Sequence, residues 1–275
     1  MPGAPEPLYV LARRVLLDAL QALDPQRKGI ILVGAQAICL QTGEIDLAVA
    51  PFTTDGDIAI NPTALQPEPK IEEVLKSAGF RPTPQPGIWS TSRSLGGVAA
   101  EVTIDLLVPE TMGGSRRRAA DLGEHGDRVA RKVRGLEAAL VDNGQMTIAS
   151  LEEYDPRSFQ VAVAGPAALL VAKLHKLNDR VATDRASDKD ALDALRLLRA
   201  VPAPEFAVRL RMLTDDPIAG EVTEEALAYL RHLFSNVSSS GSQMAGRAAA
   251  PLENPDTIAA SCAALTQDLL KALDR

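Results

Sequence analysis

Three aspartates have a spacing that could bring their carboxylates together. Asp55 and Asp57 flank a single glycine at the start of the apolar run DIAI, and Asp105 lies inside the apolar segment VTIDLLV. Residues two apart on a strand point to the same face, so Asp55 and Asp57 project together, and Gly56 is expected to let the backbone pass close between them. If the strand of Asp105 is a neighbour, three carboxylates converge, and a divalent cation such as Mg²⁺ or Mn²⁺ relieves their repulsion.

The same acids also have a purely structural explanation. Asp55 fits a turn, Asp57 can form an Asx hydrogen bond, and Asp105 can pair with an arginine. The segment upstream favours chemistry, because an expected strand, GIILV, is followed by Gly34-Ala35 and a short helix, AQAICLQTG. Backbone N–H groups at such a helix N-terminus can bind phosphate, although a glycine there also serves a plain tight turn.

Apolar periodicity and the glycine positions predict an α/β lobe over residues 1–164 and a helical lobe over residues 165–275. The first lobe is expected to hold a mixed sheet, with MTIASL and FQVAVA as candidate edge strands and a basic helical region at 113–140. Residues 235–255 are rich in Ser, Gly, Ala and Pro and are predicted to be flexible. The predicted fold class is α/β (α+β) with two lobes. The expected helices cover residues 7–23, 35–43, 69–80, 166–179, 187–200, 203–213, 223–234 and 256–273, and the other expected strands cover 29–33, 57–60, 87–92 and 97–108.

The composition is that of an ordinary globular protein. Apolar residues make up 46% of the chain and aromatic residues only 3%, so the core must consist of Leu, Val, Ile and Ala. The net charge of −7 argues against a general nucleic-acid coat protein. Cys39 and Cys262 are too few for a disulfide framework and are expected to be buried thiols. No apolar run reaches the ~18 residues of a membrane span, and the first residues do not resemble a secretory signal, so we expect a cytoplasmic protein without membrane segments.

Two separated motifs carry a resemblance to a known family. The stretches LVGAQAICLQTG, TTDGDIAI and EVTIDLLV resemble the nucleotidyltransferase fold of the DNA polymerase β superfamily. Within it they are most similar to the AbiEii/AbiGii-type toxins, including the Men-type toxins of bacterial toxin–antitoxin pairs. The later VAGPAALLVAKLHKLNDR and SDKDALDALRLL resemble that family's second signature, a lysine helix followed by a Lys-Asp helix. The resemblance covers residues 29–199 and departs at Ala35, where many members have a serine whose hydroxyl could contact phosphate.

The resemblance implies a nucleotidyltransferase that moves a nucleoside monophosphate (NMP) from a nucleoside triphosphate (NTP) to an acceptor. The acceptor hydroxyl would attack the α-phosphate in line, with pyrophosphate as the leaving group. Asp55 and Asp57 would bind the Mg²⁺ or Mn²⁺ ions that bridge the phosphates, and Asp105 would assist the second metal and accept the proton of the attacking hydroxyl. The implied catalytic residues also include Lys173. The implied nucleotide-binding residues are Gly34, Ala35, Thr54, Lys173, Lys176, Lys189 and Asp190.

The family analogy further implies tRNA, at its 3′ end, as the acceptor, and the role of a toxin that a cognate antitoxin neutralises. Two other functions stay open. The acceptor could be a Ser, Thr or Tyr hydroxyl of a protein, or the chain could be a nucleotide-binding regulatory module that has lost the transfer chemistry.

Positive charge is concentrated in two places. Lys173 and Lys176 are three apart and share a helix face, although a lysine after an apolar run also often snorkels to solvent. By the resemblance Lys189 or Asp190 reaches a cleft between the lobes, but Asp190 also fits a capping box with Ser187. His125 and His175 stand alone and are expected to pack rather than to act in catalysis. The second concentration of positive charge is a basic run that fits either a surface that binds RNA phosphates or a solvated helix face. Its candidate RNA contacts are Arg116, Arg117, Arg118, Arg131 and Arg134.

Overall fold

The computed structural model describes residues 6–43, 47, 53–182 and 188–275. These residues form two compact units. The α/β unit comprises the described parts of Met1–Ala37, Pro51–Val133 and Asn143–Ala164, and the helical unit those of Ile38–Ala50, Arg134–Asp142 and Gly165–Arg275. The chain therefore passes between the units more than once, and its last crossing follows residue 164.

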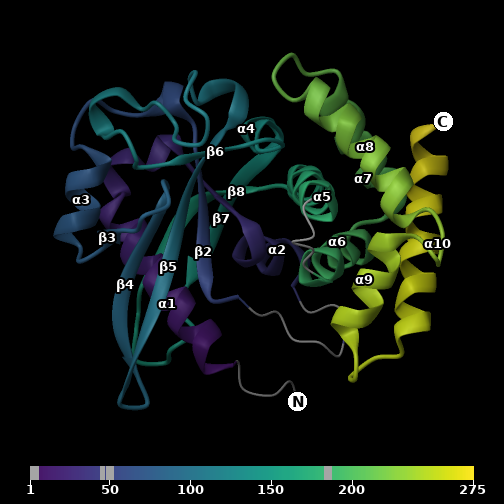
Figure 1. Cartoon of the computed structure of the whole chain (residues 1–275), viewed down its shortest axis with the longest axis horizontal. Coiled ribbons are helices and arrows are strands. Elements are labelled where there is room, and N and C mark those ends of the chain that lie inside the picture. The colour runs from purple at the N-terminus through teal and green to yellow at the C-terminus, as the bar shows by residue number, and fades with distance from the viewer. Residues whose placement is uncertain (1–5, 44–46, 48–52, 183–187) are drawn as a thin grey trace. The chain divides into compact units, whose positions relative to one another are not determined.

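A mixed sheet organises the α/β unit (Figure 1). Within the described residues it has eight strands in the order β3-β4-β5-β2-β1-β8-β7, with β6 paired to β5. β1 is antiparallel to β2 and parallel to β8, and β2 is parallel to β5. The strands are β1 (Ile30–Val33), β2 (Asp55–Ile60), β3 (Arg81–Pro82), β4 (Ile88–Leu95), β5 (Val98–Pro109), β6 (Arg131–Val133), β7 (Asn143–Ala149) and β8 (Ser158–Ala164). Together with the helices, this sheet confirms the predicted α+β class.

Helix α1 (Pro7–Ala22) packs on one face of the sheet, against β2, β4 and β5. Gly56 of β2 leaves no room for a side chain on this face, because a Cβ there would lie 2.8 Å from Ile104 Cδ1 and 3.0 Å from Leu16 Cδ1. The role expected for Gly56, a close passage between two metal ligands, is therefore corrected. The glycine lets α1 approach the sheet, on the face opposite to the aspartates that precede and follow it.

Two expectations about this unit are corrected. Of the two candidate edge strands, only β7 lies at an edge, because β8 pairs with both β1 and β7. The basic stretch 113–140 is not a continuous helix, and among its described residues it contains short 3₁₀ turns, strand β6 and helix α4 (Glu137–Val141). Glycines with positive φ interrupt it, a backbone conformation that a right-handed helix does not accommodate. These glycines are Gly114, Gly123, Gly126 and Gly135.

The helical unit contains the C-terminal half of α2 (Gly34–Thr42), helix α4 and the helices that follow residue 165. They are α5 (Pro166–Ala182), α6 (Asp188–Ala200), α7 (Ala203–Thr214), α8 (Gly220–Phe234), α9 (Ser240–Ala249) and α10 (Pro255–Leu273). Helix α9 lies within the segment predicted to be flexible, and it packs against α6, α8 and α10. Its small residues allow close helix packing: a Cβ on Gly241 would lie 2.8 Å from the Leu233 carbonyl oxygen, and one on Gly246 would lie 2.6 Å from that of Pro255. At 240–249 the Ser, Gly and Ala composition therefore reflects packing and not a flexible linker.

The two cysteines differ in their environment. Cys262 is buried in α10, and burial raises the pKa of its thiol to about 12. Cys39, on α2 (Gly34–Thr42), is only half-buried. None of the described helices is both long and apolar enough to span a membrane.

Candidate active site

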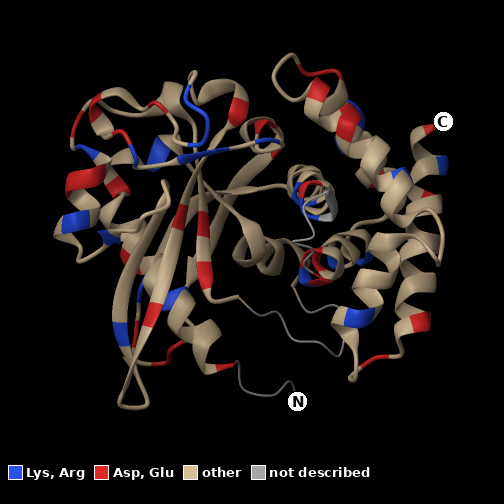
Figure 2. Ribbon diagram, in the orientation of Figure 1, with Lys and Arg blue, Asp and Glu red and all other residues tan. Residues whose placement is uncertain are grey.

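The register between β2 and β5 brings the three predicted aspartates onto one face of the sheet. Asp57 is paired with Asp105 across these parallel strands, and Asp55 is paired with Thr103. Residues paired in register on parallel strands point to the same side, and Asp55 lies two residues before Asp57. Figure 2 shows acidic segments side by side on β2 and β5. The condition that the two strands be neighbours is met, and the shared face is the one opposite α1.

Asp57 also lies against the start of helix α2. Val33, the last residue of β1, is paired with Asp57, and α2 begins at the next residue, Gly34. Gly34 has φ +68°, and a Cβ on it would lie 2.0 Å from Asp57 Oδ2. Only glycine fits here, both for the backbone conformation and for the approach of the carboxylate. The positive end of the helix dipole favours the negative charge of Asp57 and would equally favour a phosphate.

Asp105 has a partner that the sequence did not assign to it. Its Oδ2 accepts a hydrogen bond from the guanidinium of Arg131, which lies on the neighbouring strand β6. The side chain of Asp105 is only 11% exposed, so the ion pair compensates for burial of its charge. This is the arginine pairing that was the structural alternative for Asp105. Arg131 was predicted as an RNA contact, and the structure places it beside Asp105, on the sheet face that carries Asp55, Asp57 and Asp105 (the carboxylate face).

The remaining α/β positions differ in exposure. The Thr53 hydroxyl donates a hydrogen bond to Asp55 Oδ1, while Thr54 is exposed and Ala35 is buried. Among the described residues, no group of three or more His, Cys, Asp or Glu side chains is arranged to hold a metal ion. The chemistry of the donors nevertheless fits a hard divalent cation, because Asp55 and Asp57 offer carboxylate oxygens on one face. Asp105 would be added as a ligand through Oδ2 only if Arg131 released that oxygen.

In the helical unit, the predicted lysine helix and Lys-Asp helix are joined by an ion-pair cluster. The Lys173 ammonium lies 2.7 Å from Asp190 Oδ1 and 2.8 Å from Asp193 Oδ2. Lys176 lies 3.2 Å from Asp190 Oδ1, and Arg180 donates to Asp190 Oδ2. This cluster connects α5 to α6. Lys173 is buried and does not snorkel to solvent, whereas the Lys176 side chain is 45% exposed.

The charges in this cluster shift each other's pKa values. Burial alone would lower the pKa of the Lys173 ammonium, but the carboxylates of Asp193 and Asp190 outweigh it and hold the pKa above its usual value. Burial alone would raise the pKa of Asp190, but Lys173, Lys176 and Arg180 outweigh it and hold the pKa below its usual range. Lys189 is half-buried, and Ser187 of the alternative capping box lies outside the described residues.

The five predicted RNA contacts differ in their surroundings. Arg116 is exposed and lies 3.0 Å from Asp127, and Arg117 and Arg118 are exposed beside it in the chain. Arg134 belongs to the helical unit, where its guanidinium lies 2.7 Å from a carboxylate oxygen of Glu225 and is also paired with another acid of α8. Of the five, Arg116, Arg117 and Arg118 are exposed, whereas Arg131 and Arg134 are part-buried and paired with acids.

The two histidines pack as expected. His125 is buried, and its Nδ1 accepts a hydrogen bond from the backbone N–H of Ile71 at the start of α3 (Ile71–Ser77). Burial lowers the pKa of His125. The Nε2 of His175 lies 2.8 Å from the Val222 carbonyl oxygen, and its ring meets that of Tyr229 edge-on at 5.3 Å.

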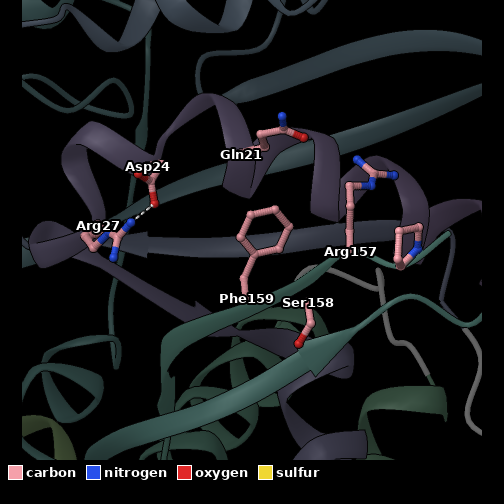
Figure 3. Close-up of a pocket in the computed structure, with 7 residues that line it drawn as sticks. Gln21, Asp24, Arg27, Arg157, Ser158 and Phe159 are labelled. Atoms are coloured by element: carbon pink, nitrogen blue, oxygen red, sulfur yellow. Dashed lines mark hydrogen bonds and ion pairs between the residues drawn. The ribbon is translucent and has the colours of Figure 1, made fainter.

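A surface depression of about 570 Å³ lies elsewhere on the α/β unit (Figure 3). Its guanidinium groups already have acidic partners, since Arg157 lies 2.6 Å from Asp18 and Arg27 is paired with Asp24. None of the three aspartates of the carboxylate face lines it. Its lining residues are Gln21, Asp24, Arg27, Pro156, Arg157, Ser158 and Phe159.

A parallel pair of strands with acids at matching positions, beside the N-terminus of a helix, is suited to cations and phosphates. A family model described as Nucleotidyltransferase matches residues 13–211 of the chain. This match includes both sequence motifs and most of the chain, and the chain therefore belongs to this nucleotidyltransferase family. No curated protein matches the chain. No solved structure matches it either.

Family membership supports NMP transfer as the general activity and an NTP as the donor. The narrower likeness to AbiEii/AbiGii-type toxins stays a prediction. Among the site residues, Arg131 has a partner, Asp105, that sequence reasoning did not identify. Its strand, β6, is only three residues long, too short for apolar alternation to reveal.

Proposed function

We propose that this chain transfers an NMP from an NTP to the 3′ end of tRNA and acts as the toxin of a toxin–antitoxin pair. The observation that carries the transfer reaction is the register of β2 and β5, which puts Asp55, Asp57 and Asp105 on one face in a chain of the nucleotidyltransferase family. The tRNA acceptor, the toxin role and the cognate antitoxin rest on the resemblance of the two sequence motifs to AbiEii/AbiGii-type toxins.

In this proposal the carboxylates of Asp55 and Asp57 hold Mg²⁺ or Mn²⁺ together with the NTP. The bound cation would neutralise charge on the triphosphate and on the departing pyrophosphate. The backbone N–H groups of Gly34 and Ala35 bind phosphate oxygens at the start of α2. Asp105, once released by its arginine, accepts the proton of the acceptor hydroxyl as that oxygen bonds to the α-phosphorus and the bond to pyrophosphate breaks.

The helical unit would add cationic contacts. Three cations meet the carboxylate of Asp190, and one of them, Lys173, also pairs with Asp193. Lys176, with its exposed side chain, is proposed as a triphosphate contact, and Lys189 is proposed as a second one. Lys173 keeps its proposed catalytic role through the charge that it brings to the cluster. In the α/β unit the exposed hydroxyl of Thr54 is proposed as a further nucleotide contact.

The test is a transfer assay with each of the four NTPs labelled separately at the α-phosphate. The protein is incubated with Mg²⁺ and total tRNA, and in parallel with Mg²⁺ and cell lysate. We expect label on RNA from at least one NTP, and none when the same NTP carries the label on its γ-phosphate. Periodate oxidation of the tRNA destroys the 3′ diol and should abolish labelling.

The other outcomes separate the alternative functions. Label on protein, with none on RNA, would favour nucleotidylylation of a Ser, Thr or Tyr hydroxyl. Binding of NTP without transfer to either acceptor would contradict both enzymatic functions and favour a regulatory module. Labelling that survives periodate treatment would exclude the 3′ end as the site of modification.

The exposed arginines at 116–118 allow a test of RNA binding. Changing Arg116, Arg117 and Arg118 together to alanine should weaken tRNA binding at moderate salt and reduce the salt dependence of the binding constant, by about 0.7 to 0.9 in slope for each phosphate that an arginine no longer neutralises. Filter binding at several salt concentrations measures both quantities. The control is Arg27→Ala, which removes another exposed arginine of the α/β unit. Equal affinity and equal slope in the triple variant and wild type would favour a solvated surface that does not touch RNA.

A further inference from the structure

Strand β6 holds Arg131 in a fixed place beside the carboxylate face. β6 pairs with β5 in parallel, with Arg131 opposite Leu107. The preceding backbone is tied to β4, because the indole N–H of Trp89 donates to the Val129 carbonyl at 2.9 Å. Gly87 approaches so closely that a Cβ on it would lie 2.6 Å from the Arg131 backbone nitrogen. These contacts fix the backbone of Arg131, while its side chain remains 36% exposed and able to move.

The guanidinium of Arg131 has hydrogen-bonding capacity beyond Asp105. One terminal N–H group donates to Asp105 Oδ2. The Nε atom is buried, and within the described part of the chain it has no hydrogen-bond acceptor. An unsatisfied buried donor is costly, and it is typical of sites where a water or an anion binds. A guanidinium offers five N–H groups in a planar fork that suits phosphate oxygens.

Arg131 and a divalent cation compete for the same carboxylate. Asp105 is the register partner of Asp57, so a cation held by the aspartates of β2 would be near it. A guanidinium and a divalent cation on one carboxylate repel each other strongly, because both are positive and the site is partly shielded from water. A cation that binds Asp105 through Oδ2, the oxygen that accepts from Arg131, therefore displaces the guanidinium.

We propose that Arg131 is a positioning residue that holds Asp105 in the cation-free protein and moves to phosphate oxygens of the nucleotide when the cation takes Asp105. This rests on the proposed nucleotidyltransferase function. The exchange conserves charge pairing, since Asp105 passes from one cation to another and the guanidinium passes from a carboxylate to a phosphate. Arg131 thereby couples cation binding to nucleotide binding.

The test uses the single tryptophan as a reporter. Trp89 is buried, lies on β4 next to the residue paired with Asp105, and is hydrogen-bonded to the segment that leads into Arg131. Binding of Mn²⁺ at the carboxylate face should change its emission. The variants are Arg131→Gln, which removes the charge, and Arg131→Lys, which keeps it. The control is Arg128→Gln, an exposed arginine three residues away that donates to the Pro84 carbonyl.

Arg131→Gln is expected to bind the cation more tightly and phosphate more weakly than wild type. Arg131→Gln should bind Mn²⁺ about tenfold more tightly than wild type, because the competitor is gone. In saturating Mn²⁺ the same variant should bind tripolyphosphate about tenfold more weakly, and the KM for NTP should rise in parallel. Arg131→Lys should lie between Arg131→Gln and wild type in both measurements, and Arg128→Gln should match wild type.

Unchanged or weaker Mn²⁺ binding in Arg131→Gln, with a melting temperature equal to that of Arg128→Gln, would overturn the proposal. If Arg131→Gln does not fold, the Arg131→Lys variant is the test. Wild-type affinities of Arg131→Lys for both Mn²⁺ and tripolyphosphate would then overturn the proposal. Failure of the proposed function gives a different pattern. In that case wild type transfers no nucleotide, while the opposite shifts in Mn²⁺ and tripolyphosphate binding still support the exchange at Arg131.

Discussion

Asp57→Asn is expected to reduce nucleotidyl transfer by about 10³-fold, the scale on which removal of a central charge-stabilising group lowers turnover. Asp57 occupies the centre of the carboxylate face, since it is the register partner of Asp105 and lies two residues from Asp55. It also lies against Gly34 at the start of α2, where cation and phosphate would meet. Asparagine keeps the shape of the side chain and removes its charge, so the transfer rate should fall while the packing against Gly34 persists.

The control for this prediction is Glu101→Gln. Glu101 lies on β5 four residues before Asp105, on the same face of the strand, and is exposed. The Glu101→Gln change removes one negative charge from the same strand and leaves Asp57 and Asp105 unchanged. The activity of this variant should stay within about twofold of wild type, as for most surface changes. Transfer is measured with α-labelled NTP, and folding by thermal melting. Wild-type activity in a folded Asp57→Asn protein would mean that the carboxylate face is not the catalytic site.

Local patterns in the sequence predicted the strands that carry the aspartates. β2 and β5 are apolar runs interrupted by single acids, and an acid inside a buried strand is informative because it must be paired. The sequence did not contain the identity of that partner. Arg131 reaches Asp105 because β6 pairs with β5, and that pairing joins segments about two dozen residues apart. A register between distant segments is a tertiary property, and no periodicity in three residues can report it.

The same limit explains the two segments whose structure was predicted wrongly. The arginines at 116–134 have spacings that suit a helix face, but the glycines between them take positive φ, which spacing alone does not reveal. In 240–249, the small polar residues suggested a linker. There the decisive fact is that Gly241 and Gly246 lie against backbone of neighbouring elements, a close approach that only the folded unit displays.

For the lysine helix, the sequence predicted the helix face of the two lysines correctly but did not predict how deeply each of them is buried. The spacing of Lys173 and Lys176 correctly put both on one face of α5 towards α6, since both contact Asp190. They differ in burial, because Lys173 is buried between two carboxylates whereas the Lys176 side chain is 45% exposed. The sequence could not rank the two, because which of them is covered depends on how α6 packs.

Lys173→Met is expected to destabilise the protein by about 3 kcal/mol, the low end of the range for removing one partner of a buried ion pair. The low end applies because Asp190 keeps Lys176 and Arg180, and Asp193 keeps Arg196. Methionine fills similar space but leaves Asp190 and Asp193 buried without the ammonium that lies within 2.8 Å of both. Urea denaturation followed by circular dichroism measures the change, which should appear as a lower midpoint with an unchanged slope. The control, Lys176→Met, removes a partly exposed partner of Asp190 and should cost about 0–1 kcal/mol.

The pH dependence follows from the directions of the pKa shifts. The pKa of Lys173 is raised, so its contribution to stability is fully present below the unfolded pKa of about 10.4 and is lost as pH rises through the folded value. The pKa of Asp190 is lowered, so its contribution is present above the unfolded pKa of about 3.9 and is lost as pH falls through the folded value. The stability difference between wild type and Lys173→Met should therefore be largest between these limits and shrink beyond each of them.

A second substitution shows whether the loss of stability in Lys173→Met comes from the carboxylate charge that has lost its ammonium partner. Asp193→Asn added to Lys173→Met removes one of the two carboxylates that lose the ammonium, so the double variant should be less destabilised than the sum of the single changes. If the destabilisation of the double variant equals the sum of the two single changes, Lys173 stabilises the protein by packing alone. Activity per folded molecule then decides its catalytic role: if Lys173 acts on the triphosphate, the double variant stays inactive even where its fold is restored, whereas a purely structural lysine predicts that activity returns with stability.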